Sequence, residues 1–507
     1  MKKLLGTTAI GLALAVSPAM AGDQTDVNQV MNIVAPQDAD NEAFGFNLLN
    51  VDQLASNLGN YVDNVGNYDD IDQFIGVPQS ADNLMDIEGN SVDTSTQAAS
   101  NSANVVDIID GTTGDVNALT QTVNFGGDIQ SASNRLETND EGGGQGNVVV
   151  DDFEQTASNT GNYANVDDVF EFATQAFANP DDNQVASNFI GGDVGSNDPN
   201  VESQLNNVEQ SASNGANILL ADDFRDGATG FLQSIGQTVD QTATNTAWFE
   251  LGVTDTDQSA SNTANYADVN GVDGKATQNT GEQADQVARN RLLREDADDD
   301  GLGSVLGSSQ TASNYANIFK SVIEIGGDRP EQDKGGNQTP DPDVDQLVQY
   351  GGDSQRATNQ LSFGDRLGED TTGPNKFNSS QDATNIMNLA EVENLSGDGL
   401  GGGDTIALQT AAGVGNDGEP AEQLATNNAF FEGSGTERGH VTDFGQGATN
   451  LANVMYAGNL PSLSATEFSQ SLSLPQTAMN SIDTIGNLTE VSQSSSNVGN
   501  VLSGLDD

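Results

Sequence analysis

Few residues in this 507-residue chain have the types that catalysis requires. The chain has no Cys and a single histidine, His440, so Cys-His catalytic arrangements are excluded, a Ser-His arrangement has at most this one base, and metal sites with several His or Cys ligands cannot form. No Gly-x-Ser-x-Gly elbow, phosphate-binding loop or dinucleotide fingerprint stands in a strand-turn-helix context. We therefore predict that the protein is not an enzyme.

One acidic segment has the spacing of a calcium-binding loop. Asp296, Asp298 and Asp300 alternate along the chain, and Gly301 follows them. Carboxylates at this spacing converge on a hard cation in the first half of an EF-hand loop, where Gly permits the turn. The Glu expected at the twelfth position is replaced by Gly307. The segment is interpreted as a solvated acidic turn, with calcium held by the three Asp side chains as the alternative. No other cofactor is expected.

The composition excludes nucleic acid as a partner. The chain carries 15 Lys and Arg against 76 Asp and Glu, a formal net charge of −61, whereas binding to phosphates depends on clustered basic side chains. The one basic cluster, Arg289, Arg291 and Arg294, is interpreted as a solvated edge. Hydrophobic residues make up 35% of the chain and aromatic residues 5%, too little bulky apolar surface for a conventional core of this length.

The N-terminus has the pattern of a secretory signal peptide. Lys2 and Lys3 precede an apolar run over residues 4–16, and a small-x-small sequence ends at Ala21. The apolar run is too short to cross a bilayer. We expect residues 1–21 to be removed and the protein to be secreted, in the extracellular space or at the cell surface.

A short motif, Gln-x-Ala-x-Asn, dominates the remainder. From Gln53 onward it recurs 17 times at intervals of 17 to 45 residues, with Ser495 replacing the Ala in the last copy. Counting the Gln as position zero, the restricted positions are 0, +2, +4 and +6, and an apolar residue is common at +8. Restriction to even positions predicts a β-strand, because side chains of a strand alternate between its two faces.

The even positions are assigned to the protein interior. Buried amides are costly when single, but amides stacked at the strand spacing of about 4.8 Å donate to one another in a ladder. Position +3 is usually Ser or Thr and is interpreted as solvent-facing, with ice or glycan binding as the alternative. The clearest copies, whose amides we assign to the ladders, are Gln155 with Asn159, Gln210 with Asn214, Gln258 with Asn262, Gln310 with Asn314 and Gln446 with Asn450.

The motif spacing predicts an all-β fold, a β-solenoid of about 17 strand-arc-strand repeats with acidic loop insertions. Shorter apolar stretches that contain Gln, such as residues 119–125 and 231–235, supply the second strand of each unit. Residues 22–52 are expected to form a lead segment and residues 53–507 the repeat domain. Stacked at about 4.8 Å per unit, the repeats would give a rod about 80 Å long.

The pattern resembles curlin repeats, the units of secreted bacterial amyloid fibres. The shared features are the export signal, the absence of Cys, the scarcity of Lys and aromatic residues, and the inward Gln and Asn of a two-strand coil, from about Gln53 to Val501. The resemblance implies a structural subunit of a functional amyloid, with a nucleator and an outer-membrane export pore as partners.

The function expected from these observations is self-assembly, with other copies of the chain as partners. The product would be an extracellular amyloid-like fibre that serves a biofilm matrix or adhesion. Three alternatives stay open at this point. They are a monomeric, calcium-stabilised adhesin or ice- or glycan-binding solenoid, a parallel β-helix enzyme acting on polysaccharides, and a disordered acidic calcium buffer.

Overall fold

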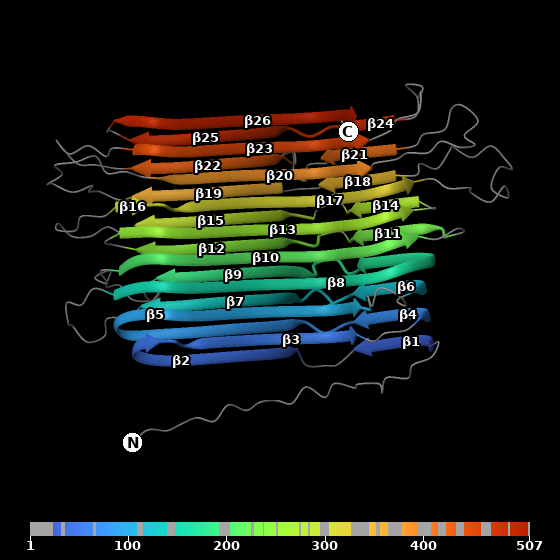
Figure 1. Cartoon of the computed structure of the whole chain (residues 1–507), viewed down its shortest axis with the longest axis horizontal. Coiled ribbons are helices and arrows are strands. Elements are labelled where there is room, and N and C mark those ends of the chain that lie inside the picture. Colours follow the sequence, from blue (N-terminus) through green and yellow to red (C-terminus); the bar gives the residue numbers. More distant parts are fainter. Residues whose placement is uncertain are drawn as a thin grey trace, which may run out of the picture.

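The protein is an all-β solenoid, as the sequence predicts. In the computed structural model the described residues form 26 strands and no helix (Figure 1). The described residues are 24–31, 36–63, 67–108, 115–138, 148–191, 203–224, 228–236, 238–249, 252–272, 275–281, 284–294, 304–325, 344–350, 355–363, 378–392, 407–413, 422–431, 441–457, 468–484 and 487–504.

The chain winds through nine turns, and each turn passes through three faces in the same order. All strand pairs join neighbouring turns and are parallel. The first face, named the short face, consists of β1 (Gln24–Met31), β4 (Tyr68–Ile75), β6 (Val116–Val123), the end of β8 (Val148–Phe177), β11 (Gly230–Ile235), β14 (Lys275–Thr280), β18 (Val344–Tyr350), β21 (Ala407–Gly413) and β24 (Phe468–Leu472).

Two longer faces carry the Gln-x-Ala-x-Asn motif. Motif face 1 consists of β2 (Gln37–Leu49), the start of β5 (Gln79–Asp107), β7 (Ile129–Thr138), β9 (Asn183–Gly191), β12 (Gln241–Phe249), β15 (Gln286–Arg294), β19 (Gln355–Phe363), β22 (Gln423–Phe431) and β25 (Gln476–Thr484). Motif face 2 consists of β3 (Asp52–Val62), the end of β5, most of β8, β10 (Ser203–Phe224), β13 (Gly252–Val272), β16 (Ser304–Leu306) with β17 (Ser309–Ile325), β20 (Ser379–Val392), β23 (Val441–Ala457) and β26 (Leu488–Gly504).

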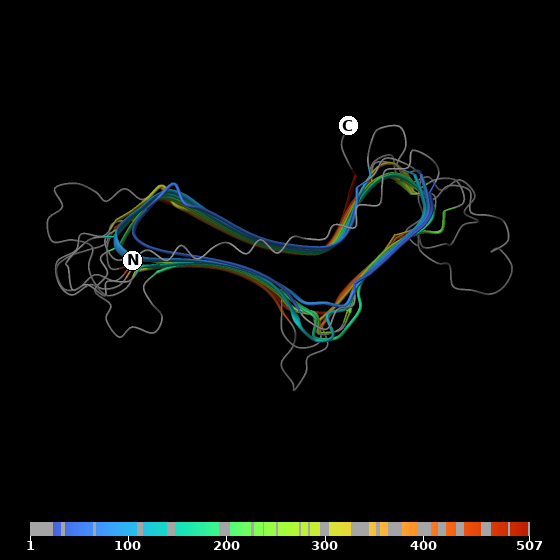
Figure 2. The same cartoon turned by 90° about the horizontal axis from the view of Figure 1, so that it is seen from below.

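Seen along the solenoid axis, the cross-section is long, thin and bent (Figure 2). The first half of motif face 2 lies against motif face 1, where Gln155 donates to the carbonyl of Phe189. The second half lies against the short face, where Gln175 donates to the carbonyl of Ile218. Motif face 2 thus bends so that one strand can cover two partners.

The bend lies where two successive residues of motif face 2 both point inward. In β8 these residues are Gly161 and Asn162, which break the alternation of buried and partly exposed positions. A Cβ on Gly161 would lie 2.7 Å from the carbonyl oxygen of Ala216 and would overlap the ring of Phe177. Position +6 of motif face 2 is therefore Gly or Ala in eight of its nine copies, whereas motif face 1 has a larger residue, such as Leu136, in six of its nine copies and Ala in the other three.

The core between the faces consists of apolar and amide side chains and is thin in its middle, and the buried Asp182 lies between β8 and β9. Between the two motif faces, the motif Ala residues form one column of 15 buried side chains. Larger side chains fill the two ends of the cross-section, with Phe153 in the cluster at one end and Phe224 in the cluster at the other. Ala between the amides allows the two sheets to approach closely enough for each amide to reach the opposite backbone.

The arrangement of the repeats differs from the one expected. Each turn contains two motif copies, so a copy stacks on the next but one along the chain, as Gln155 does on Gln210. Nine turns separated by about 4.8 Å span about 38 Å, not the 80 Å expected from 17 stacked units. Because one motif serves two faces, the motif alone does not reveal the length of the turn.

The solenoid also begins earlier than residue 53. Gln37-Asp-Ala-Asp-Asn41 is an eighteenth motif copy, and it pairs with the copy at Gln79. Strand β1 pairs with β4 in the same first turn. Most of the expected lead segment, residues 22–52, is therefore part of the solenoid. The expected signal peptide, residues 1–21, lies outside the described residues.

Candidate functional site

Six columns of buried amides run the length of the solenoid. Three are Gln columns, one on each face, and three are Asn columns, at +4 of both motif faces and at +7 of motif face 2. Each column has nine members, one per turn, and every neighbouring pair is joined by a side-chain hydrogen bond of 2.7 to 3.0 Å. The columns are the most extensive polar network in the described part of the chain.

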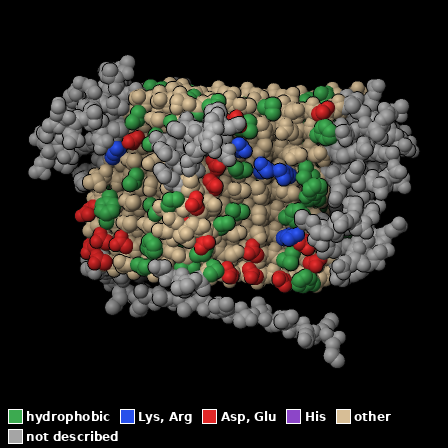
Figure 3. Space-filling model, turned by 180° about the vertical axis from the view of Figure 1, so that it is seen from behind, with side chains coloured by type: hydrophobic (Ala, Val, Ile, Leu, Met, Phe, Trp, Pro, Cys, Tyr) green, Lys and Arg blue, Asp and Glu red, His purple; other side chains and the backbone are tan. Residues whose placement is uncertain are grey.

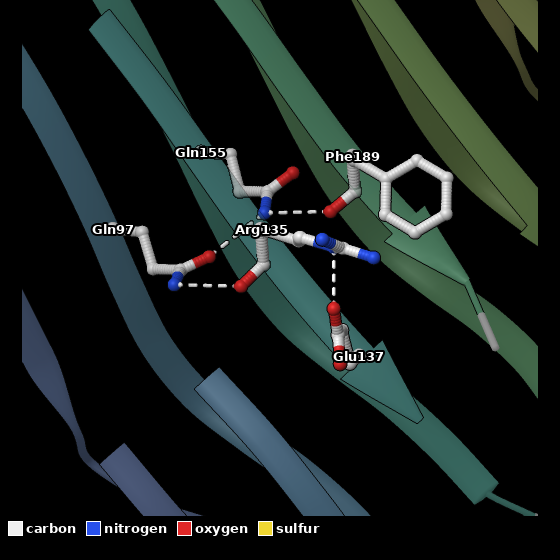
Figure 4. Close-up of polar contacts among 5 residues, drawn as sticks. All are labelled: Gln97, Arg135, Glu137, Gln155 and Phe189. Carbon is white, nitrogen blue, oxygen red and sulfur yellow. Dashed lines mark hydrogen bonds and ion pairs between the residues drawn. The ribbon is translucent and has the colours of Figure 1, made fainter. Parts of the chain in front are cut away.

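The second N–H of these amides crosses the interior. Gln155 donates to Gln97 at 2.8 Å and to the backbone carbonyl of Phe189 at 3.1 Å, and Gln97 donates in the same way to the carbonyl of Arg135 (Figure 4). A buried amide thus stabilises the stack along the axis and holds two faces together across it. Both functions need the same residue at the same register in every turn.

The ladder residues inferred from the sequence all lie on motif face 2. Gln155, Gln210, Gln258, Gln310 and Gln446 belong to its Gln column. Their partners in the motif belong to its +4 Asn column, as Asn159, Asn214, Asn262, Asn314 and Asn450. The sequence analysis placed all motif copies on a single face. In the structure, successive copies alternate between motif face 2, which holds these residues, and motif face 1, which lies opposite.

Sequence reasoning missed two columns. The +7 Asn column, for example Asn162 and Asn217, is present in all nine copies of motif face 2 and in none of motif face 1. Asn at +7 therefore occurs in every second motif copy along the chain, and this alternation in the sequence could have indicated that each turn contains two copies. In the short face, the sequence predicts strands at residues 119–125 and 231–235 but assigns no ladder to them, whereas their Gln121 and Gln233 belong to the Gln column of that face.

Both ends of the solenoid are open among the described residues. Nine apolar side chains pack against the core while remaining partly exposed, and all belong to the first or last turn: Val27, Met31, Ala39, Ala43, Val51, Leu472, Ala478, Ile482 and Val491. Among the most exposed large apolar side chains, Phe44 at 64% and Leu54 at 69% lie on the first turn, and Leu488 at 51% lies on the last. The interior columns therefore end without a cap in the part of the chain that the structure describes.

On the face of the solenoid that Figure 3 shows, acidic side chains are scattered among uncharged ones, together with a few Lys and Arg. Acidic residues stack between turns, as Asp40 does on Asp82. Burial, together with the nearby carboxylates of Asp82, Asp38 and Glu42, raises the pKa of Asp40. Burial also raises the pKa of Asp182, although its carboxylate accepts N–H bonds from Phe125 and Gly127.

Basic side chains gather at one place on the outside of motif face 1. Arg289 and Arg291 lie on β15, and Arg356 lies on the neighbouring β19. Burial and the two like charges lower the pKa of Arg289. A separate arginine, Arg135, pairs with Glu137 and lies over the ring of Phe189 (Figure 4).

The described residues offer no site for a metal. No group of three His, Cys, Asp or Glu side chains within them is arranged to hold an ion. The expected calcium ligands Asp296, Asp298 and Asp300, and also His440, lie outside the described ranges. Within the described ranges, no helix has the length and hydrophobicity needed to cross a membrane.

Breaking one ladder in the middle of the stack should destabilise the solenoid. Asn214→Ala removes the acceptor of Asn159 and the donors to Asn262 and to the carbonyl of Thr242. We expect a loss of at least about 2 kcal/mol, because buried polar groups lose their partners. The outward Ser213→Ala on the same strand should change stability by less than about 0.5 kcal/mol. Urea unfolding followed by circular dichroism measures both, and equal effects would contradict the role of the ladder.

Mild acid should stabilise the protein. A raised pKa means that the folded state binds the proton more tightly than the unfolded chain, so this contribution to stability is present at low pH and is lost as pH rises through the folded pKa. The pKa values of Asp40, Asp182 and Asp382 are all raised above 3.8, mainly by burial. The thermal unfolding midpoint should therefore increase as the pH is lowered from neutral toward 3.8, the ordinary Asp value. Asp382→Asn should reduce that increase, and a midpoint that falls over this range would contradict the assignment.

Comparisons with known proteins give no relative. No family model matches the chain, and no curated protein or solved structure matches it either. The functional argument therefore rests on the ladders, the open end turns and the charge of this chain.

Proposed function

We propose that the protein is a secreted structural subunit that polymerises end to end into an extracellular, amyloid-like fibre. The observation that supports this proposal is that six amide columns and the apolar core run through all nine turns and stop open at both ends. Another copy placed on an end turn extends every column by further turns of the same kind. Folding and assembly then use the same interactions.

The uncapped ends favour polymerisation over a monomeric role. Open strand edges and exposed apolar side chains are sites of association unless something covers them. The end turns carry seven of the twelve most exposed large apolar side chains in the described residues: Val30, Phe44, Leu49, Leu54, Met479, Leu488 and Leu502. End-to-end contact would shield strand edges that water otherwise surrounds.

Export and assembly partners remain part of the proposal. The N-terminal pattern of residues 1–21 supports secretion. The resemblance to curlin repeats supports a fibre in a biofilm matrix or in adhesion, a nucleator and an outer-membrane export pore. The net charge of −61 makes a nucleic acid an unfavourable partner.

A second candidate function is a monomeric adhesin, or an ice- or glycan-binding solenoid. The observation in its favour is the outer surface of motif face 2, where position +3 is Ser or Thr in every turn. The members are Ser56, Ser100, Ser158, Ser213, Ser261, Ser313, Thr384, Thr449 and Ser496. This candidate does not use the open ends, so we place it second.

The fibre proposal predicts concentration-dependent assembly of residues 22–507. Unbranched fibres that bind thioflavin should form, and they should form faster at high ionic strength, because salt screens repulsion between chains of net charge near −60. Negative-stain microscopy and thioflavin fluorescence, with calcium or with chelator, measure this outcome.

Three results separate the alternatives. Calcium-dependent fibres would support the acidic loops as metal sites. Persistent monomers with strong β circular dichroism would contradict the fibre and favour the adhesin. Monomers without β signal would contradict the solenoid in solution.

A further inference from the structure

We infer that the fibre is polar: the last turn (β24, β25, β26) of one copy binds the first turn (β1, β2, β3) of the next, and copies do not join through like ends. This inference rests on the proposed end-to-end assembly and adds the identity of the two surfaces that meet. It derives from the direction of the amide ladders, from the residues that end the core columns, and from the shape of the cross-section.

The Gln and Asn ladders run in opposite directions. In all three Gln columns, the amide of a later turn donates to the Gln of the turn before it, as Gln210 donates to Gln155. In all three Asn columns, the amide of an earlier turn donates to the Asn of the turn after it, as Asn159 donates to Asn214. No column in the described residues reverses along the nine turns.

The direction of each ladder is set by the opposite wall. The remaining N–H of Asn159 donates to the backbone carbonyl of Val185 at 2.7 Å. A carbonyl is an acceptor only, so the side-chain amide must present nitrogen to it and cannot rotate by 180° without placing oxygen against oxygen. Nitrogen positions fixed in this way at most turns, and ladder bonds that continue through the others, give each column one direction.

The two ends therefore expose opposite hydrogen-bonding groups. On the first turn, Gln37 and Gln53 have no preceding Gln to receive an N–H, while the Oδ1 of Asn57 receives no donor from the described residues. On the last turn, the Oε1 of Gln493 receives no donor from a following Gln, and Asn497 has no following Asn to receive its N–H. The free Gln N–H groups of the first turn match the free Gln oxygens of the last turn. The free Asn N–H groups of the last turn match the free Asn oxygens of the first turn.

The same superposition matches the ends of the apolar columns. Placing Gln470, Gln476 and Gln493 over Gln29, Gln37 and Gln53 continues the register that every internal turn uses. It brings together the partly exposed core residues in pairs: Leu472 with Met31, Ala478 with Ala39, Ile482 with Ala43, and Val491 with Val51. A small or medium apolar residue meets another in each case.

Contact between like ends lacks this match. Two first turns would present Gln donors to Gln donors, and two last turns would present Asn donors to Asn donors. Turning one copy over also reverses its strands and mirrors the outline of its cross-section. The bent outline with one short face does not superimpose on its mirror image, so the three faces would not all find partners (Figure 2).

Each end can be blocked separately by isosteric substitutions. Gln37→Glu with Gln53→Glu keeps the oxygens that accept from Gln79 and Gln97 but replaces the free donors of the first turn, and it also removes the bond from Gln53 to the carbonyl of Leu84. Asn497→Asp with Asn500→Asp keeps the oxygens that accept from the preceding Asn residues and replaces the free donors of the last turn. It also removes their bonds to the carbonyls of Gln476 and Gln470, so the retained fold of each variant must be measured. In both variants a carboxylate would face an amide oxygen of the incoming copy.

Matched controls place the same added charge on the outside of the same turns. Asn28→Asp with Ser56→Glu is the control for the first turn, and Ser494→Asp with Ser496→Asp is the control for the last. These positions lie next to the inward ladder residues of their strands and point outward. Circular dichroism of each variant tests that its fold is retained, and the controls should form fibres.

Sedimentation velocity of the blocked variants, alone and mixed, tests the polarity. A polar fibre predicts that each blocked variant alone stays monomeric, with at least a tenfold loss of thioflavin growth rate, and that an equimolar mixture forms a one-to-one dimer through the two intact ends. Dimers of either blocked variant alone, or a mixture without dimers, would overturn the inference while wild-type fibres still stand. Wild-type monomers would instead overturn the proposed function, and the inference would fall with it.

Discussion

A buried primary amide has two N–H donors and an acceptor, and the whole structure depends on giving all of them partners. In most inner members of the columns one N–H goes to the neighbouring turn, the other goes to the opposite wall, and the oxygen accepts from the turn on its other side, as for Asn159. This requirement forces identical residues into identical register in successive turns. It also explains how a chain with 5% aromatic residues maintains an ordered interior.

Much of the fold could be predicted from the sequence because a strand has a period of two. The even positions of the motif indicate the inward side, and Gln210 and Asn214 do lie there. The length of the turn could not be predicted from the motif, because opposite walls need the same amides and hence the same residues. The differences that separate the walls lie outside the motif: Asn at +7, and a small residue at +6 where motif face 2 bends.

The open ends could not be predicted with the same detail, because they depend on three-dimensional register. The sequence alone does not show that Gln and Asn ladders point in opposite directions, since that depends on which carbonyl lies across the interior.

The acidic exterior has a different role from the interior. Negative charge keeps separate chains apart, whereas the amide columns that stop at the end turns offer directional groups, so the balance between repulsion and stacking depends on ionic strength.

Disulfide trapping within one copy tests the two-copy turn most directly, and the absence of native Cys removes background reactions. Ser158 and Ser213 are register partners on neighbouring turns, about 4.8 Å apart and within disulfide range, whereas Ser187 lies on the opposite outer face. The account predicts that Ser158→Cys with Ser213→Cys forms an intramolecular disulfide under mild oxidation and that Ser158→Cys with Ser187→Cys does not. A disulfide in the second pair but not in the first would contradict it.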